Sequence, residues 1–409
     1  MRYVIIGGSI AGISAAKAIR RSDARAEITM LSAEKNQPYY RPLISTVIEQ
    51  RGIDIAVGDK PLDKYGIRII YDQATGIDVR AKEVMLSSKK RIPYDKALIA
   101  TGRRPMTPAV PGAAGPDVFP LRSMEDAHNI LAAARGRKNA VVLGGGFVGL
   151  KAAIALKRLG LTITIIELLD RILHEKLDKL GSSIVSDLLR RADINLVTNQ
   201  QYYEIIRTSG SIQSVRLASG RIIDADVIVS AIGTTPNIEA FRDSGITIHK
   251  GIVIQESLQT SVPDVYAAGD VVEYRDLVSN SYSVSGSWAN AEEMGTLAGK
   301  NMSGAAIKYI GFLSLMNTFD VLTTPITTIG MVNPPPSGYD IFVEYGDGPY
   351  RKLVFKNDVV VGALFIGNPE RAGVYPYLIK NRIPLGKLKA LAIRGVLGAQ
   401  NFKDQSVKI

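Results

Sequence analysis

The sequence predicts an α/β protein that contains two similar domains, each built on a parallel β-sheet. A repeated strand–turn–helix pattern and the length of the chain predict this fold class. A β-branched strand, a glycine-rich turn and an Ala-rich helix follow one another near residue 3 and again near residue 140, and a second strand follows each helix. This strand–helix–strand order is typical of parallel sheets. The length of 409 residues corresponds to two to four domains.

The composition excludes several classes of protein. Apolar residues make up 46% and charged residues 22%, which is ordinary for a soluble globular chain. No apolar run reaches the roughly 18 residues that a membrane span needs. The sequence has no cysteine, which excludes disulfides, thiolate catalysis and metal clusters held by protein thiolates. Three widely spaced histidines do not favour a zinc site, and we expect no metal.

The positive charge of the chain is concentrated at its C-terminal end. The net charge is +11, and residues Tyr350 to Ile409 contribute 11 Lys/Arg against three Asp/Glu, or +8. A basic region of this kind indicates an acidic partner or surface. The alternative is a basic face that contacts only solvent.

The first strand–turn–helix begins at the N-terminus. Met1-Arg2 and the apolar residues after them resemble a signal peptide, but we reject that interpretation because the same residues form a strand, a glycine turn and a helix. The strand Tyr3–Ile6 leads to a turn with Gly7, Ser9 and Gly12. We expect the helix to end near Arg21 and a second strand, Glu27–Ser32, to lead to Glu34.

The second copy has the same order. The strand Ala140–Leu143 leads to Gly144, Gly146 and Gly149, the helix runs to Gly160, and the strand Thr162–Ile166 ends at Glu167. Val4–Ile19 and Val141–Leu156 are identical at seven of 16 positions, at an offset of 137 residues. An internal repeat of this length indicates two copies of one structural unit.

The chemistry of a dinucleotide explains these residues. Gly7 and Gly144 permit a tight turn, the third position of the motif lets the backbone approach a pyrophosphate, and Gly12 and Gly149 let the helix pack closely on the strand. Gly146 fits the third position, whereas the first copy has Ser9 there. The helix N-terminus offers N–H groups to the phosphates. Glu34 and Glu167, which lie 27 and 23 residues after the first glycine, are placed to bind ribose hydroxyls.

Further segments identify a family. Three strands end in small residues, within Tyr94–Pro105, Asp226–Asn237 and Val262–Asp270. Together with Tyr39–Ser45 and Leu364–Gly373, they resemble the FAD-dependent pyridine nucleotide-disulfide oxidoreductase superfamily, in its NADH:rubredoxin and ferredoxin reductase branch. The resemblance covers nearly the whole chain. It is specific for the superfamily and less specific for the electron acceptor.

The resemblance implies the domain layout. Two Rossmann-like dinucleotide-binding domains of the glutathione-reductase type are expected, together with a smaller C-terminal α/β domain. The FAD-binding domain would comprise residues 1–110 and 236–310, and the NAD(H)-binding domain residues 111–235. Residues 311–409 would form the C-terminal interface domain.

The resemblance also implies site residues. Glu34 would hold the adenosine ribose of FAD, Asp270 would bind the ribityl chain, and Trp288 would precede a helix beside the flavin. For Asp270 the alternative is a helix N-cap, and Trp288 is equally well explained as a core residue. The remaining expected FAD contacts are Gly7, Ser9, Gly12, Arg41, Pro42, Ala74, Thr101 and Gly102. The expected NAD(H) contacts are Gly144, Gly146, Gly149, Glu167 and Gly233.

The absence of cysteine excludes several reactions that other members of this superfamily catalyse. Disulfide reductases of the superfamily need a cysteine pair, and its peroxidases, water-forming oxidases and CoA-disulfide reductases need one redox cysteine. We therefore expect NADH to reduce FAD by hydride transfer, and FAD to reduce an external iron–sulfur carrier directly. The carrier would be of the ferredoxin or rubredoxin type, or an iron–sulfur subunit of a larger redox enzyme. An acidic carrier would dock on the basic C-terminal region, where Lys380, Arg382, Lys387, Lys389 and Arg394 lie close together in the sequence.

Other functions stay open at this point. One is an NAD(P)H dehydrogenase for quinones or small acceptors, with Leu385–Val396 as a basic apolar segment at a membrane surface. Another is a non-catalytic flavoprotein that senses redox state. A nucleic-acid binder is disfavoured because no recognised module is present. We expect a cytoplasmic protein with no transmembrane segment.

Two further predictions concern single residues. Glu167 would bond the ribose 2′-hydroxyl and repel a 2′-phosphate, so NADH is expected to be preferred over NADPH. The alternative is that Glu167 pairs with Arg171. Related ferredoxin reductases have a flavin-side Lys–Glu pair, where this chain has Thr46 and Lys151. Lys151 is therefore a candidate catalytic residue that keeps one positive charge beside the flavin. The alternative is that it points to solvent.

Overall fold

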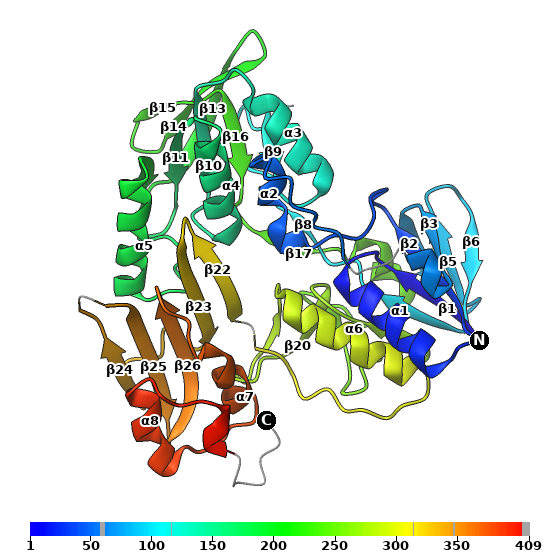
Figure 1. The fold of residues 1–409 in the computed structure, drawn as a ribbon. Coiled ribbons are helices and arrows are strands. Elements are labelled where there is room, and N and C mark those ends of the chain that lie inside the picture. The colour runs from blue at the N-terminus through cyan, green and yellow to red at the C-terminus, as the bar shows by residue number, and fades with distance from the viewer. Residues whose placement is uncertain (58–61, 116, 314, 347, 403–409) are drawn as a thin grey trace. The chain divides into compact units, whose positions relative to one another are not determined.

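A computed structural model describes residues 1–57, 62–115, 117–313, 315–346 and 348–402. Contacts divide the chain into two compact units. The first unit comprises Met1–Ile44, Asp54–Arg104 and Thr234–Ser314, and the second comprises Ser45–Ile53, Pro105–Gly233 and Leu315–Ile409. Figure 1 colours both units along the chain. Each unit holds one of the two glycine turns.

The first unit is built on a five-stranded parallel sheet. Its strands are, in spatial order, β19 (Val265–Ala267), β7 (Lys96–Ile99), β1 (Arg2–Ile6), β2 (Glu27–Ser32) and β3 (Ile67–Tyr71). The central strand β1 is buried from Tyr3 onward, as expected for a parallel sheet that is covered on both faces. The strand β2 has the bounds that the sequence predicts.

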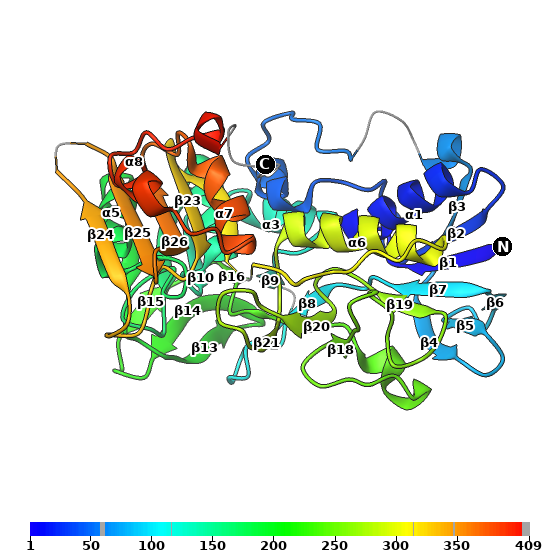
Figure 2. The same ribbon diagram turned by 90° about the horizontal axis from the view of Figure 1, so that it is seen from below.

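Two long helices, α1 (Ile10–Ser22) and α6 (Trp288–Met302), lie side by side on one face of this sheet (Figures 1 and 2). Glycines of α6 make this close approach possible. A Cβ at Gly295 would lie 2.1 Å from the carbonyl oxygen of Ala11, and one at Gly299 would lie 2.4 Å from that of Ala15. The backbones of the two helices therefore touch directly.

Smaller sheets complete the first unit. Figure 2 shows one of them, β4–β5–β6, on the side of the parallel sheet away from α1 and α6. The antiparallel strands of that sheet are β4 (Ala74–Asp78), β5 (Glu83–Leu86) and β6 (Arg91–Pro93). The other strands are β18 (Ile252–Val253), β20 (Val272–Arg275) and β21 (Tyr282–Val284) in one sheet, and β8 (Arg103–Pro105) with β17 (Thr234–Pro236) in another. Short 3-10 helices cover Arg41–Leu43, Leu62–Tyr65 and Glu239–Ser244.

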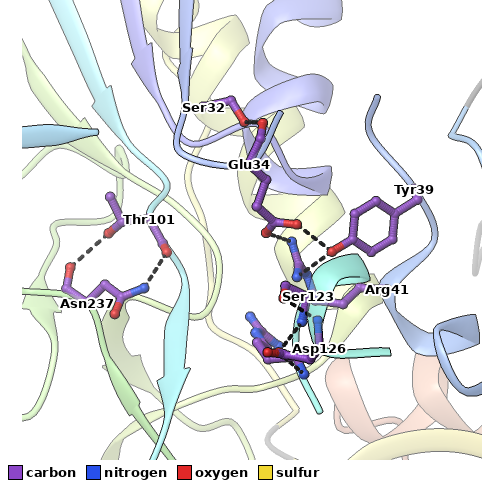
Figure 3. A network of polar contacts seen from close by, with 9 residues as sticks. Ser32, Glu34, Tyr39, Arg41, Thr101, Ser123, Asp126 and Asn237 are labelled. Atoms are coloured by element: carbon purple, nitrogen blue, oxygen red, sulfur yellow. Dashed lines mark hydrogen bonds and ion pairs between the residues drawn. The ribbon is translucent and has the colours of Figure 1, made fainter. Parts of the chain in front are cut away.

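The second unit repeats the parallel-sheet plan. Its strands are, in spatial order, β12 (Ile194–Val197), β11 (Thr162–Ile166), β10 (Asn139–Leu143), β16 (Val227–Ser230) and β9 (Val118–Pro120). An antiparallel sheet consists of β13 (Tyr202–Thr208), β14 (Ser211–Leu217) and β15 (Ile222–Asp224). The helices are α2 (Ser45–Ile48), α3 (Met124–Ala134), α4 (Phe147–Arg158) and α5 (Lys179–Arg191). Ser123 and Asp126 form a reciprocal capping box at the start of α3 (Figure 3).

The C-terminal residues of the second unit form an antiparallel sheet with short helices. The strands are, in spatial order, β22 (Met316–Val321), β23 (Thr324–Gly330), β26 (Val359–Ile366), β25 (Tyr350–Lys356) and β24 (Asp340–Glu344). The helices are α7 (Tyr375–Lys380) and α8 (Lys389–Ile393), with 3-10 turns at Ala372–Val374, Gly386–Leu388 and Ala399–Phe402.

A buried polar cluster joins this sheet to the rest of the second unit. Asp178, the N-cap of α5, accepts hydrogen bonds from the Tyr350 hydroxyl at 2.6 Å and from Lys352 Nζ at 2.9 Å. Burial raises the pKa of Asp178, but these two donors and the N–H of Gly181 together outweigh it and leave the pKa below its ordinary value. The ion pair thus ties α5 to β25. The three-domain division expected from the sequence stays a prediction.

Candidate functional site

The first glycine turn can exist only with glycine at two positions. Gly7 has φ +130°, and a Cβ there would lie 2.1 Å from the carbonyl oxygen of Ala100. A Cβ at Gly12 would lie 2.0 Å from the carbonyl oxygen of Gly7, so α1 packs directly on the turn. Ser9 is the N-cap of α1, and its side chain makes no capping bond. The N–H groups of the first turn are therefore suited to bind an anion.

The second turn has the same geometry. Gly144 has φ +100° and a Cβ there would lie 2.5 Å from the carbonyl oxygen of Ala231, while a Cβ at Gly149 would lie 1.9 Å from that of Gly144. Gly146 is the N-cap of α4 and has open space around it. The internal repeat seen in the sequence is thus a repeat of three-dimensional structure, with one turn in each unit.

Glu34 and Arg41 come together at the end of β2. The carboxylate of Glu34 accepts hydrogen bonds from Arg41 Nη2 at 2.7 Å and from the Tyr39 hydroxyl at 2.5 Å, and Arg41 Nη1 donates to the same hydroxyl at 2.9 Å (Figure 3). A carboxylate can accept about four hydrogen bonds. Glu34 therefore keeps acceptor capacity for ribose hydroxyls while Arg41 and Tyr39 orient it.

Thr101 and Gly102 are held by a residue that the sequence analysis gave no role. The Thr101 hydroxyl donates to the carbonyl oxygen of Asn237 at 2.9 Å, and Asn237 Nδ2 donates to the carbonyl oxygen of Thr101 at 2.9 Å (Figure 3). The backbone N–H of Asn237 also donates to the carbonyl oxygen of Gly102. This pairing joins the end of the β7 segment to a segment 136 residues later. In the sequence, the only sign of this role of Asn237 is its position after a turn of small residues.

The other expected FAD contacts lie in loops and at strand ends of the first unit. Asp270 follows Gly269, which has φ +81°, and the chain then continues into β20 rather than into a helix. The N-cap alternative for Asp270 is therefore wrong. Pro42 lies in the 3-10 turn after Tyr40, and Ala74 is the first residue of β4. Trp288 is the first residue of α6, and its ring centre lies 5.5 Å from that of Tyr40.

Glu167 lies against the second glycine turn. Its carboxylate accepts hydrogen bonds from the N–H of Gly145 at 2.6 Å and from the N–H of Leu169 at 2.8 Å. Arg171 donates to Asp170 at 2.9 Å. Glu167 thus accepts hydrogen bonds from one N–H of the glycine turn and from one N–H of the segment after β11, and its negative charge sits where a nucleotide ribose is expected. Gly233, with φ +119°, accepts a hydrogen bond from the N–H of Met106.

Lys151 lies on α4 and is half-buried. Burial lowers the pKa of Lys151, while Asp320 and Glu49 act in the opposite direction. The helix α2, which contains Thr46, packs against α4. The two positions that carry a Lys–Glu pair in related reductases are therefore on adjacent helices of the second unit.

Two cations that the sequence analysis did not single out are also partly buried. Lys176 Nζ lies 5.3 Å from the ring centre of Phe147, the first residue of α4. Arg103 Nη2 donates to the carbonyl oxygen of Thr234 at 2.8 Å. Burial lowers the pKa of both groups, with Glu175 opposing it at Lys176 and Asp270 at Arg103. Lys176 belongs to no recognisable sequence motif. Arg103 follows Thr101 and Gly102 in the segment Tyr94–Pro105, but only the structure shows that its side chain is partly buried.

The basic residues near the C-terminus differ in exposure. Arg382, Lys387 and Arg394 are exposed. Lys389 Nζ pairs with Asp340 at 3.0 Å and lies 4.8 Å from the ring centre of Phe355. In the same segment, Leu385 is only 3% exposed. Among the residues that the structure describes, every helix is too short or too polar to cross a bilayer.

The fold and the two glycine turns together define a protein with two dinucleotide-binding sites. The family model described as pyridine nucleotide-disulphide oxidoreductase matches residues 1–295, and the chain belongs to this family. The predicted superfamily, the α/β fold class and the use of FAD with a pyridine nucleotide by an enzyme are thereby confirmed.

Individual relatives are similar over most of the chain. NADH-rubredoxin oxidoreductase of Clostridium acetobutylicum is 32% identical over 313 residues, which cover 75% of this chain and 76% of the relative. The solved structure of an NAD-dependent persulfide reductase from A. fulgidus is 29% identical with a TM-score of 0.88, over 95% of this chain and 79% of that one.

A third relative is much longer than this chain. Nitrite reductase [NAD(P)H] of Bacillus subtilis is 28% identical over 399 residues, which cover 96% of this chain. The match covers 49% of the nitrite reductase, so the chain spans about half the length of that relative.

Proposed function

We propose that the chain is an FAD-dependent NADH oxidoreductase that passes electrons to an iron–sulfur carrier protein. The observation that carries this proposal is the pair of equivalent glycine turns, each with a carboxylate at the end of the following strand, in a chain without cysteine. A relative named NADH-rubredoxin oxidoreductase supports the type of acceptor.

The residues of the first unit fit FAD. The turn at Gly7 leaves no room for a side chain, and the N-terminus of α1 faces it, as a pyrophosphate requires. Glu34 would bind the adenosine ribose, and Arg41 and Pro42 would lie along the dinucleotide. Ala74, Thr101, Gly102 and Asp270 would complete the site. We assign residues 1–110 and 236–310 to this domain.

The second turn would hold NAD(H), in a domain of residues 111–235. Gly144, Gly146 and Gly149 would accommodate the pyrophosphate, and Gly233 would border the site. Glu167 would accept a hydrogen bond from the ribose 2′-hydroxyl and repel a 2′-phosphate. Its two backbone hydrogen bonds fix the carboxylate at this place. NADH is therefore expected to be preferred over NADPH.

The electrons must leave the enzyme without a protein thiol. Bound FAD would supply the exchange between two-electron and one-electron chemistry. One NADH releases two electrons and one proton as it becomes NAD⁺, so two one-electron carriers are reduced in each cycle. Since the chain has no cysteine, no residue can store the electrons as a dithiol. The acceptor must therefore approach the cofactor itself.

An acidic carrier would dock on the basic part of the C-terminal domain, residues 311–409. Arg382, Lys387 and Arg394 are exposed on this part of the chain. Lys389 contributes less, because Asp340 already neutralises it. Charge complementarity of this kind accelerates encounter and depends on ionic strength.

Lys151 is proposed to keep a positive charge in the catalytic region. It is half-buried, with its pKa lowered by burial, so it does not simply extend into solvent. A positive charge near a reduced cofactor stabilises the negative charge that reduction adds. Glu49 and Asp320 act against this lowering of the pKa and so favour the charged form of Lys151.

The decisive experiment is stopped-flow reoxidation of NADH-reduced protein by a panel of acceptors. We expect the purified protein to be yellow and to transfer electrons fastest to an acidic iron–sulfur protein of the rubredoxin or ferredoxin type. Faster transfer to a quinone would favour a quinone dehydrogenase, and FAD binding without turnover would favour a sensor. A folded protein that does not bind added FAD would overturn the proposal.

A further inference from the structure

Two consecutive arginines in the first unit have opposite environments. Arg103 and Arg104 are the first residues of β8, and successive side chains of a strand point to opposite sides. Arg104 is exposed and pairs with Glu239 at 2.7 Å. Arg103 is half-buried, and its Nη2 donates to the carbonyl oxygen of Thr234 at 2.8 Å. In the described part of the chain, the buried Nε of Arg103 has no hydrogen-bond partner.

A half-buried guanidinium whose buried Nε has no acceptor within the described ranges needs a reason, because a buried donor without a partner destabilises the fold. Arginine stays protonated even when buried. Thr234 offers only a neutral carbonyl oxygen. The acidic group that acts on Arg103 is Asp270, which raises its pKa against the larger effect of burial. Asp270 is also the residue assigned to the ribityl chain of FAD.

The start of α6 lies next to Arg103. A Cβ built on Gly286, two residues before α6, would lie 3.7 Å from Arg103 Nη1. The N-cap residue Ser287 makes no side-chain capping bond. The N-terminus of a helix carries a partial positive charge of roughly half an elementary charge. A full and a partial positive charge therefore meet at one place in the first unit.

We propose that Arg103 contacts the flavin ring of FAD and stabilises the additional negative charge of the reduced cofactor. This inference rests on the FAD site proposed above. The pyrophosphate is assigned to Ser9 and the N-terminus of α1. The parallel helix α6 begins beyond that point, because its eighth residue, Gly295, packs on Ala11 at the start of α1. Arg103 instead lies with Asp270 and the start of α6. The ring is the only part of FAD whose charge changes on reduction, so a charge placed there affects the redox equilibrium.

Arg103 is better suited to this task than Lys151. Burial lowers the pKa of Lys151, whereas a guanidinium stays protonated even when buried. Within the residues described, Arg103 also has a buried Nε without an acceptor. A guanidinium can also donate in a plane to two acceptors at once, which matches the edge of a flavin ring. Both cations can contribute, and their effects are separable by mutation.

The test compares Arg103→Met with Arg104→Met, which removes a neighbouring arginine from the exposed side of the same strand. The redox potential of bound FAD is measured by reductive titration against a reference dye. The dissociation constant of oxidised FAD is measured with apoprotein. Arg103→Lys keeps the charge and shows whether charge or packing is responsible for the effect. It also replaces Arg103→Met in the test if that variant does not fold.

We expect Arg103→Met to bind oxidised FAD within about threefold of the wild type, and its affinity for reduced FAD to fall at least about tenfold more than its affinity for oxidised FAD. A tenfold difference lowers a two-electron potential by about 30 mV. Arg103→Lys should recover most of this shift, and Arg104→Met should match the wild type. An unchanged potential in Arg103→Met would overturn the inference. An equal loss of affinity for oxidised and reduced FAD would also overturn the inference, because it would place Arg103 at the phosphates. Failure of wild-type protein to bind FAD would instead overturn the proposed function.

Discussion

A single methyl group at Gly149 is expected to damage the NAD(H) site and to leave the FAD site intact. The Cβ of Gly149→Ala would lie 1.9 Å from the carbonyl oxygen of Gly144, where an ordinary contact begins at 3.4 Å. The helix α4 must therefore move by about 1.5 Å from the turn that it packs on, the difference between these two distances. The carbonyl oxygen belongs to the backbone and the position of the Cβ is fixed by the backbone, so a side-chain rotation cannot relieve the contact.

The magnitude follows from this displacement. Overpacking of a folded interior costs about 1–3 kcal/mol, and a misplacement of about 1 Å in a binding site can cost about 100-fold in rate. We expect Gly149→Ala to lower the thermal unfolding temperature and to raise the KM for NADH at least about tenfold. The FAD-to-protein ratio, measured by absorbance, should stay at the wild-type value, because the first turn is in the other unit.

Gly146→Ala is the matched control in the same turn. Gly146 has φ −79° and nothing within 4 Å of its Cβ position, so alanine fits without strain. Ser9 carries a Cβ at the corresponding position of the first turn. The control should keep wild-type stability and a KM for NADH within about threefold. Wild-type stability and KM in Gly149→Ala, or equal damage in both variants, would refute the steric argument.

Three further predictions concern charge. Glu167→Gln should reduce the preference for NADH at least about tenfold, because a hydrogen bond to a charged group contributes about 1.5–3 kcal/mol; equal catalytic efficiency of wild type with NADH and NADPH would contradict the assignment. Replacing Arg382, Lys387 and Arg394 by Glu should slow the reduction of an acidic carrier and remove the salt dependence of that reaction. The reduction of a dye should change little. Unchanged turnover with the carrier would mean that this face contacts only solvent. Lys151→Met should make the flavin potential more negative and slow reduction by NADH with FAD still bound, and wild-type values of both would show that Lys151 has no role there.

Local sequence patterns were sufficient for the nucleotide-binding motifs. The strand Glu27–Ser32 and the strand Thr162–Ile166 have the predicted bounds, and both glycine turns lie where the repeat places them. These elements depend on residues that are close in the sequence: apolar β-branched runs, glycines at fixed spacing and small residues in the following helix. The family was predicted from these elements together with further segments, among them Tyr39–Ser45 and Tyr94–Pro105.

Other features depend on contacts between distant segments. Asn237 supports Thr101 across 136 residues, and the pair Lys352–Asp178 spans 174 residues. No local pattern marks such pairs, because each residue type is common in unrelated loops and strands. The tertiary structure was needed to show that these side chains meet.

The sequence by itself determined the fold class, the two dinucleotide-binding motifs and the absence of a redox thiol. Only the tertiary structure decided which charges are exposed and which are buried. Arg103 and Arg104 are adjacent and chemically identical, yet one is half-buried beside Asp270 and the other pairs with Glu239 at the surface. The physical reason is that burial and pairing of a charge depend on the segments packed around it, and residue type alone does not specify those segments.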